Sequence, residues 1–132
     1  MADTTAIQTT SFDDVMANDY ICTVDTNTVE GKKVAANALN AAVSLKELGD
    51  KKFKLVNVIT TPGTRSQTNE DCINTYLIDS KGNAYFTQST GIFRSAKNLA
   101  AIFNRDFGEG IDVQVVSTPT NTGNTIKSLK WL

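Results

Sequence analysis

The residues that could carry chemistry in this chain are lysines and arginines interleaved with aromatic side chains between residues 51 and 105. This segment holds eight basic residues against three acidic ones, and Tyr76, Tyr85, Phe86 and Phe93 lie among them. Lysine and arginine attract phosphate groups, and aromatic rings stack on exposed bases. The composition is therefore typical of a surface that binds single-stranded nucleic acid, although a solvated basic face without a ligand has the same composition.

The candidate site residues divide into cations and stacking rings. We predict that phosphates are held by Lys54, Arg65, Arg94, Lys97 and Lys127 and that bases stack on Tyr76, Tyr85 and Trp131. Because neighbouring side chains of a strand point to opposite faces, only one of Tyr85 and Phe86 can face a ligand, and we expect it to be Tyr85. Phe86 is then a core residue, as are Phe53, Phe93 and Phe103. For the three stacking candidates, a core or edge position is an equally good interpretation.

The charge of the whole chain conceals the basic segment. The chain has 13 basic and 14 acidic residues, and such a near-balance by itself argues against a polyanionic partner. Residues 1–50, however, hold three basic residues against eight acidic ones, which offset the positive segment. The acidic part includes Asp3, Asp13, Asp14, Asp19 and Asp25. One hypothesis is that it folds over the basic groove and competes with a ligand there.

The chain contains no histidine, and this absence excludes several catalytic classes. Ser-His-Asp and Cys-His nucleophile pairs and HExxH zinc sites all need an imidazole. Cys22 and Cys72 are far apart and form no CxxC motif, so we expect two buried thiols rather than a disulfide or a zinc site. We therefore predict a binding protein that is not an enzyme and that uses no metal or cofactor.

Periodicity and turn residues predict the elements that position these side chains. Residues 1–18 form a polar acidic arm with one helical turn from Ser11, residues 20–24 a strand, and residues 30–48 an amphipathic helix that ends at Gly49. The later strands are expected at 53–60, 72–79, 84–88, 111–115 and 125–131, with a helix at 91–104. Turns are expected at 61–64, 80–83 and 121–124.

This order predicts a mainly β, α+β fold. We expect an OB-like five-stranded antiparallel barrel or sheet, with a helix between strands three and four and an additional helix before the barrel. Residues 1–132 form a single domain, in which the arm occupies 1–18, a strand and the amphipathic helix 19–50, and the OB-like core 51–132. No apolar run is long enough to span a membrane, and residues 1–5 are too polar for a secretory signal, so we expect no membrane contact.

Four segments carry a family resemblance: VITTPGTR at 58–65, NTYLID at 74–79, GNAYFTQS at 82–89 and GIFRS at 91–95. Together with the helix that precedes them, they resemble small single-stranded DNA-binding proteins of tailed bacteriophages that replicate by protein priming in Gram-positive hosts. The resemblance implies a protein that coats displaced single strands during phage DNA replication. It implies phage replication proteins as further partners and the host cytoplasm as the location, and it names no site residues.

A second hypothesis is a phage accessory protein that binds a host or phage protein, as a defence inhibitor or a virion assembly factor. The acidic N-terminal third would then imitate a nucleic-acid backbone toward a basic partner. The sequence predicts no particular oligomeric state.

Overall fold

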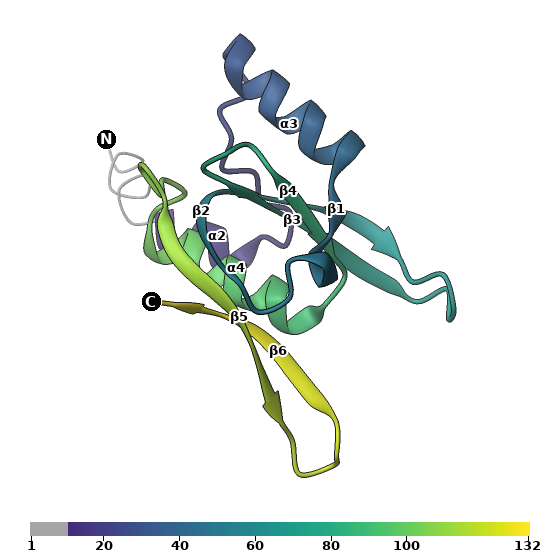
Figure 1. Cartoon of the computed structure of the whole chain (residues 1–132). Coiled ribbons are helices and arrows are strands. Elements are labelled where there is room, and N and C mark those ends of the chain that lie inside the picture. Colours follow the sequence, from purple (N-terminus) through teal and green to yellow (C-terminus); the bar gives the residue numbers. More distant parts are fainter. Residues whose placement is uncertain (1–10) are drawn as a thin grey trace, which may run out of the picture.

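The computed structural model describes residues 11–132, which form a curled six-stranded sheet and three α-helices (Figure 1). In chain order the elements are α2 (Ser11–Ala17), α3 (Val29–Ala41), β1 (Val43–Ser44), the short 3-10 helix η1 (Leu45–Glu47), β2 (Lys52–Thr64), β3 (Asp71–Asp79), β4 (Ala84–Thr87), α4 (Thr90–Ile102), β5 (Ile111–Pro119) and β6 (Thr125–Trp131). No helix of the described residues has the length and apolar character needed to cross a membrane.

The sheet has the strand order β1-β4-β3-β2-β5-β6, and only the β1–β4 pair is parallel. Strands β2, β3 and β4 follow one another as a meander, and β5 returns through α4 to lie beside β2. Three consecutive strands with a fourth returning beside the first make a Greek key.

Strand β2 changes partner along its length, and this change curls the sheet. Residues 52–55 pair with β5, whereas the pairing with β3 runs from Leu55 to Thr64 and shifts register between Leu55 and Asn57. Such an irregularity bends a strand and increases its twist. The sheet therefore closes into a half-barrel instead of remaining flat.

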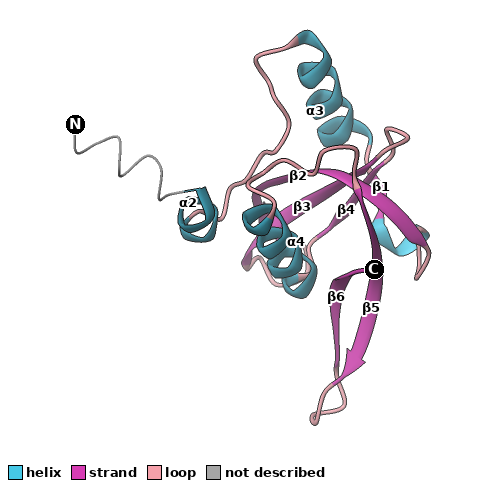
Figure 2. Cartoon of the chain, turned by 90° about the vertical axis from the view of Figure 1, so that its left-hand side faces the viewer, coloured by secondary structure: helices cyan, strands magenta, loops and turns pink. Residues whose placement is uncertain are grey.

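Helices cover the two faces of the sheet (Figure 2). On one face α4 packs against β2, β3 and β6 and forms the main core, in which Leu55, Leu77, Ile92 and Val113 are fully buried. Helix α2 packs on α4 from outside. On the other face α3 lies against β3 and β4, over a smaller apolar cluster that includes Ala38.

The first turn of α4 meets β6 through Gly91. A Cβ atom at this position would lie 2.0 Å from the carbonyl oxygen of Lys127. Only a residue without a side chain permits this approach. Gly91 therefore holds the helix against β6, which is the last strand of the sheet.

The predicted helix over residues 30–48 is wrong beyond residue 41. Ala42 has an extended backbone with ψ of 144°, and Val43–Ser44 then adds a sixth strand to the expected five. Leu45 and Leu48 reach the main core, whereas Ala38 packs in the smaller cluster on the other face. One straight helix cannot contact both faces of a sheet, so the chain turns at Ala42.

Two predicted boundaries near β2 are also wrong. Residues 20–24 form only the isolated bridge between Cys22 and Ile59, because the side chain of Thr23 accepts the N–H of Val58 in place of a regular ladder. Residues 61–64 continue β2 instead of turning. Pro62 is tolerated because this stretch pairs with β3 alone, and a proline fits a strand that has a free side. The later strands and α4 lie where they were predicted, with small differences at their ends.

We expect Gly91→Ala to destabilise the protein by about 2 kcal/mol, because the new methyl group overpacks the contact with Lys127. At an unhindered helix position the same change is stabilising by about 0.5–1 kcal/mol, so the sign of the effect is diagnostic. Urea denaturation measures it. Asn98→Ala on the exposed side of α4 is the control and should leave stability nearly unchanged. A Gly91→Ala protein as stable as the parent would contradict the close approach.

Candidate nucleic-acid interface

A hollow of about 660 Å³ lies across the open side of the half-barrel. One wall comes from β1, η1 and the end of β4, and the other from β5 and β6. These walls belong to opposite ends of the strand order, so only the curl of the sheet brings them together. We call this hollow the open-side groove. Its charged, aromatic and amide lining residues are Lys46, Asp50, Arg65, Phe86, Gln88 and Lys127.

A second hollow of about 560 Å³ adjoins the first, between α4, the start of β3 and the end of α2. We call it the α4 hollow. Its charged and aromatic lining residues are Asp19, Arg65, Asp71, Phe93, Arg94 and Lys97. Arg65 and Gln88 line both hollows. The two hollows therefore meet at Arg65 and form one path along the surface.

Arg65 is held in place at this junction. It directly follows β2, and its Nη2 donates to the carbonyl oxygen of Gln88 at 3.1 Å and to Oγ1 of Thr90 at 3.5 Å. Its backbone N–H donates to Glu70 O at 2.9 Å across the loop. Thr90 begins α4, whose N-terminus carries a partial positive charge. The junction thus combines a guanidinium with the positive end of a helix.

The structure brings four of the predicted site residues together. Arg65, Arg94 and Lys97 share the α4 hollow, and Lys127 lies in the open-side groove. Lys54 lies elsewhere, with its ammonium 3.8 Å from Asp112.

The predicted stacking rings lie elsewhere too. Trp131 is half exposed, but it packs on Phe103 with ring centroids 5.1 Å apart and lines neither hollow. Tyr76 lines neither hollow and packs beside the smaller cluster under α3, although its ring centroid lies 5.3 Å from that of Phe86.

Of Tyr85 and Phe86, both half-buried, Phe86 and not the predicted Tyr85 lines the open-side groove. Tyr85 packs against the main core with its ring 5.8 Å from that of Phe53, whereas Phe86 lines the open-side groove. Burial, and then the nearby charge of Asp79, raise the pKa of the Tyr85 phenol. The prediction that Tyr85 and Phe86 point to opposite faces of the sheet is correct. Because β4 has only four residues and carries an aromatic residue on each face, its sequence does not show which face packs on the core.

Phe86 and Phe93 were predicted only as core residues, and Phe93 is indeed buried, but each of them also lines one of the two hollows. Phe86 is partly buried, and Phe93 is 9% exposed and lines the α4 hollow. The Lys97 ammonium lies 5.7 Å from the centre of the Phe93 ring. Their position among the cations of the basic segment is the sequence signal that could have indicated them. Lys46 was missed because it was placed inside the long predicted helix.

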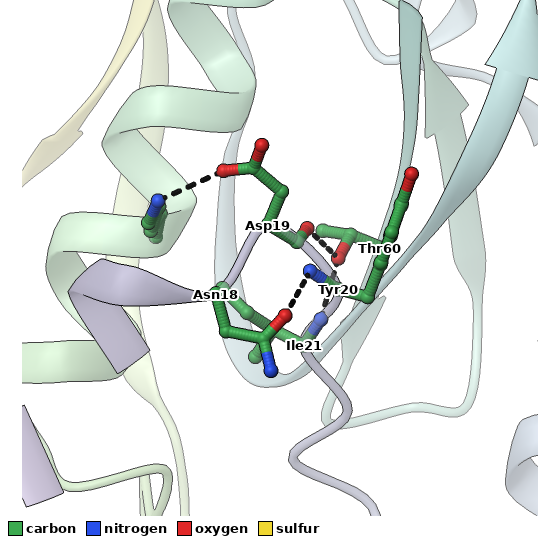
Figure 3. A network of polar contacts seen from close by, with 6 residues as sticks. Asn18, Asp19, Tyr20, Ile21 and Thr60 are labelled. Atoms are coloured by element: carbon green, nitrogen blue, oxygen red, sulfur yellow. Dashed lines mark hydrogen bonds and ion pairs between the residues drawn. The ribbon is translucent and has the colours of Figure 1, made fainter. Parts of the chain in front are cut away.

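Part of the acidic N-terminal segment contacts the basic segment directly. Asp19 Oδ1 lies 3.0 Å from Lys97 Nζ at the α4 hollow, and Figure 3 shows this contact as a dashed line from the Asp19 carboxylate. The Lys97 side chain is only 13% exposed and that of Asp19 is 59% exposed. A second ion pair joins Asp14 to Arg105 at 3.5 Å. Asp3 lies outside the described residues.

Thr60 fixes the backbone at Asp19 (Figure 3). Its buried hydroxyl donates to the carbonyl oxygen of Asp19 at 2.7 Å and accepts the N–H of Ile21 at 2.6 Å. One side chain of β2 therefore positions the segment that presents the Asp19 carboxylate to Lys97.

Residues 11–132 contain no group of three or more cysteines and carboxylates placed to hold a metal ion. Both cysteines are free thiols. Cys22 is exposed and Cys72 is partly buried beside the α4 hollow, so the expectation of two buried thiols is wrong. Comparisons of the chain with protein-family models, with curated proteins and with solved structures find no match.

We expect Thr60→Val to destabilise the protein by about 1–3 kcal/mol, because the buried N–H of Ile21 loses its acceptor. Thr118→Val makes the same chemical change at an exposed position of β5 and should shift stability by less than about 0.5 kcal/mol. Urea denaturation of both variants measures the difference. Equal stability of the two variants would show that the Thr60 hydroxyl does not hold the segment.

Proposed function

We propose that this protein binds single-stranded DNA independently of sequence, along the path formed by the open-side groove and the α4 hollow. The observation that carries the proposal is the position of Arg65, which lines both hollows and joins Lys127 on one side to Arg94 and Lys97 on the other. Cations spaced along a groove match a phosphate backbone, which repeats its charge along the strand.

We also propose that the half-barrel is an OB-like fold extended by β1. Five strands, β2 to β6, form a Greek-key sheet with α4 between the third and fourth, and this supports the assignment. OB-folds bind oligonucleotides on the face of strands 2 and 3 and on the loops that follow strands 1 and 4. In this chain the corresponding parts that line the hollows are the start of β3, the end of β4 and Arg65 at the beginning of the loop after β2, and the β5–β6 turn lies beyond Ser117 and Thr125 of the open-side groove. The outer face of β3 and β4 is partly covered by α3, so the path proposed here follows the ends of these strands.

Two kinds of residue contact the DNA in this proposal, cations and aromatic rings. Lys46, Arg65, Arg94 and Lys127 attract phosphates, while Phe86 and Phe93 offer apolar walls to bases. Aromatic faces accept every base, so such a site has little sequence preference. Binding of this kind needs no cofactor or catalysis. With the phage resemblance of residues 58–95, it suits a protein that coats displaced strands during phage DNA replication in the host cytoplasm.

We expect the protein to bind a labelled oligo-dT of about 16 nucleotides at low salt, with an affinity that falls steeply as salt rises. Lys127→Ala and Arg94→Ala should each weaken binding several-fold and lower the salt slope by about 0.7. Fluorescence anisotropy of the labelled DNA is the suitable measurement, because Trp131 packs on Phe103 outside both hollows and need not be quenched.

Lys32→Ala is the matched control for these variants, since Lys32 is exposed on α3. It removes the same charge and should change affinity much less. Absence of binding by the parent protein at low salt would overturn the proposed function. Equal losses in Lys32→Ala and Lys127→Ala would reject the groove as the site.

We expect Asp19→Asn to tighten binding of single-stranded DNA a few-fold at low salt, because a phosphate then reaches Lys97 without displacing a carboxylate. Asp14→Asn is the control, since it removes the same charge from the ion pair with Arg105. Anisotropy titrations of both variants separate a local effect from one of net charge. Equal affinities for the two variants would mean that Asp19 does not compete with DNA.

A further inference from the structure

A third hollow, of about 390 Å³, lies where the start of β2 meets the turn between β3 and β4. Its walls carry four lysines, and we call it the lysine hollow. The four are Lys51, Lys52, Lys54 and Lys81. None of them lines the open-side groove or the α4 hollow. The path proposed above therefore leaves this cluster unexplained.

Two carboxylates also line the lysine hollow, but they do not neutralise it. Asp79 is 7% exposed, and its oxygens accept the backbone N–H groups of Lys81 at 2.9 Å and Asn83 at 2.8 Å and the Asn83 side-chain amide at 3.1 Å. Asp79 is thus occupied in holding the turn. Asp112 lies 3.8 Å from Lys54.

The other three lysines, Lys51, Lys52 and Lys81, are exposed and have no ion-pair partner among residues 11–132. The Tyr85 phenol in the wall is uncharged at neutral pH and adds no negative charge. The lysine hollow is therefore a concave surface with an excess of positive charge, which suits an anionic ligand.

The lysine hollow adjoins the open-side groove through one short segment. Lys46, Gly49 and Asp50 line the groove, whereas Leu48, Lys51 and Lys52 line the lysine hollow. The two hollows are thus separated only by the turn formed by residues 48–51. This turn is anchored, because the carbonyl oxygen of Asp50 accepts the side-chain amide of Gln114 on β5 at 2.7 Å.

We propose that the lysine hollow binds the phosphates of the same single-stranded DNA molecule beyond the open-side groove. A strand that leaves the groove at Lys46 crosses Gly49 and next meets Lys51, and then the lysines at the start of β2 and in the β3–β4 turn. The proposal rests on the proposed function and extends its path by a third stretch. Long strands contact this stretch, and short strands held in the groove do not.

The test compares two oligo-dT lengths, about 5 and about 16 nucleotides, which lie near the two ends of the usual range for one OB-fold. The double variant Lys51→Ala/Lys81→Ala should bind the long oligonucleotide about 10-fold more weakly, with a salt slope lower by about 1.4. Its affinity for the short oligonucleotide should not change. The double variant Lys32→Ala/Lys33→Ala removes the same charge from exposed positions on α3 and should leave both affinities nearly unchanged.

The outcomes separate this inference from the proposed function. Equal losses for the short and long oligonucleotides, or the same loss in both double variants, would show an effect of net charge and overturn the inference. An unchanged affinity for the long oligonucleotide would also overturn it, while binding in the groove stands. If the parent protein binds neither length, the proposed function itself fails. All replaced lysines are exposed, and unchanged urea midpoints confirm that the variants fold.

Discussion

The pairing of β2 with two partners is the constraint on which the rest of the structure depends. Its first residues belong to a ladder with β5 and the remainder to a ladder with β3, and the register shift after Leu55 separates the two. A strand that pairs on opposite sides at its two ends forces the sheet to curl. The curl then brings β1 and β4 across from β5 and β6, and the open-side groove is the space between them.

Packing of α4 maintains this curl. The helix fills one face of the sheet and reaches β6 through the contact of Gly91 with Lys127. The same helix carries Arg94 and Lys97, and its N-terminus lies beside Arg65. Helix α4 therefore both closes the core and positions these cations, so a shift of α4 would alter the proposed interface as well as the stability.

The distribution of charge over the surface matters more for binding than the net charge of the chain. Three hollows carry an excess of cations, while two carboxylates of the N-terminal segment pair with Lys97 and Arg105. Electrostatic attraction is screened over about 10 Å at ordinary salt, so a ligand in a hollow responds to the nearest charges. A net charge of −1 is therefore compatible with an interface for a polyanion.

The sequence by itself determined the later strands, α4 and the cationic residues, because period-2 and period-3.6 patterns and turn residues are local signals. It also placed Arg65, Arg94, Lys97 and Lys127 among the candidates. Only the tertiary structure decided that Ala42 ends α3, that Phe86 and not Tyr85 lines the groove, and that Lys54 lies with Lys51 and Lys81 in a separate hollow. These outcomes depend on which faces of the sheet are covered. That coverage results from contacts between segments that are distant in the chain, and local sequence patterns do not reveal such contacts.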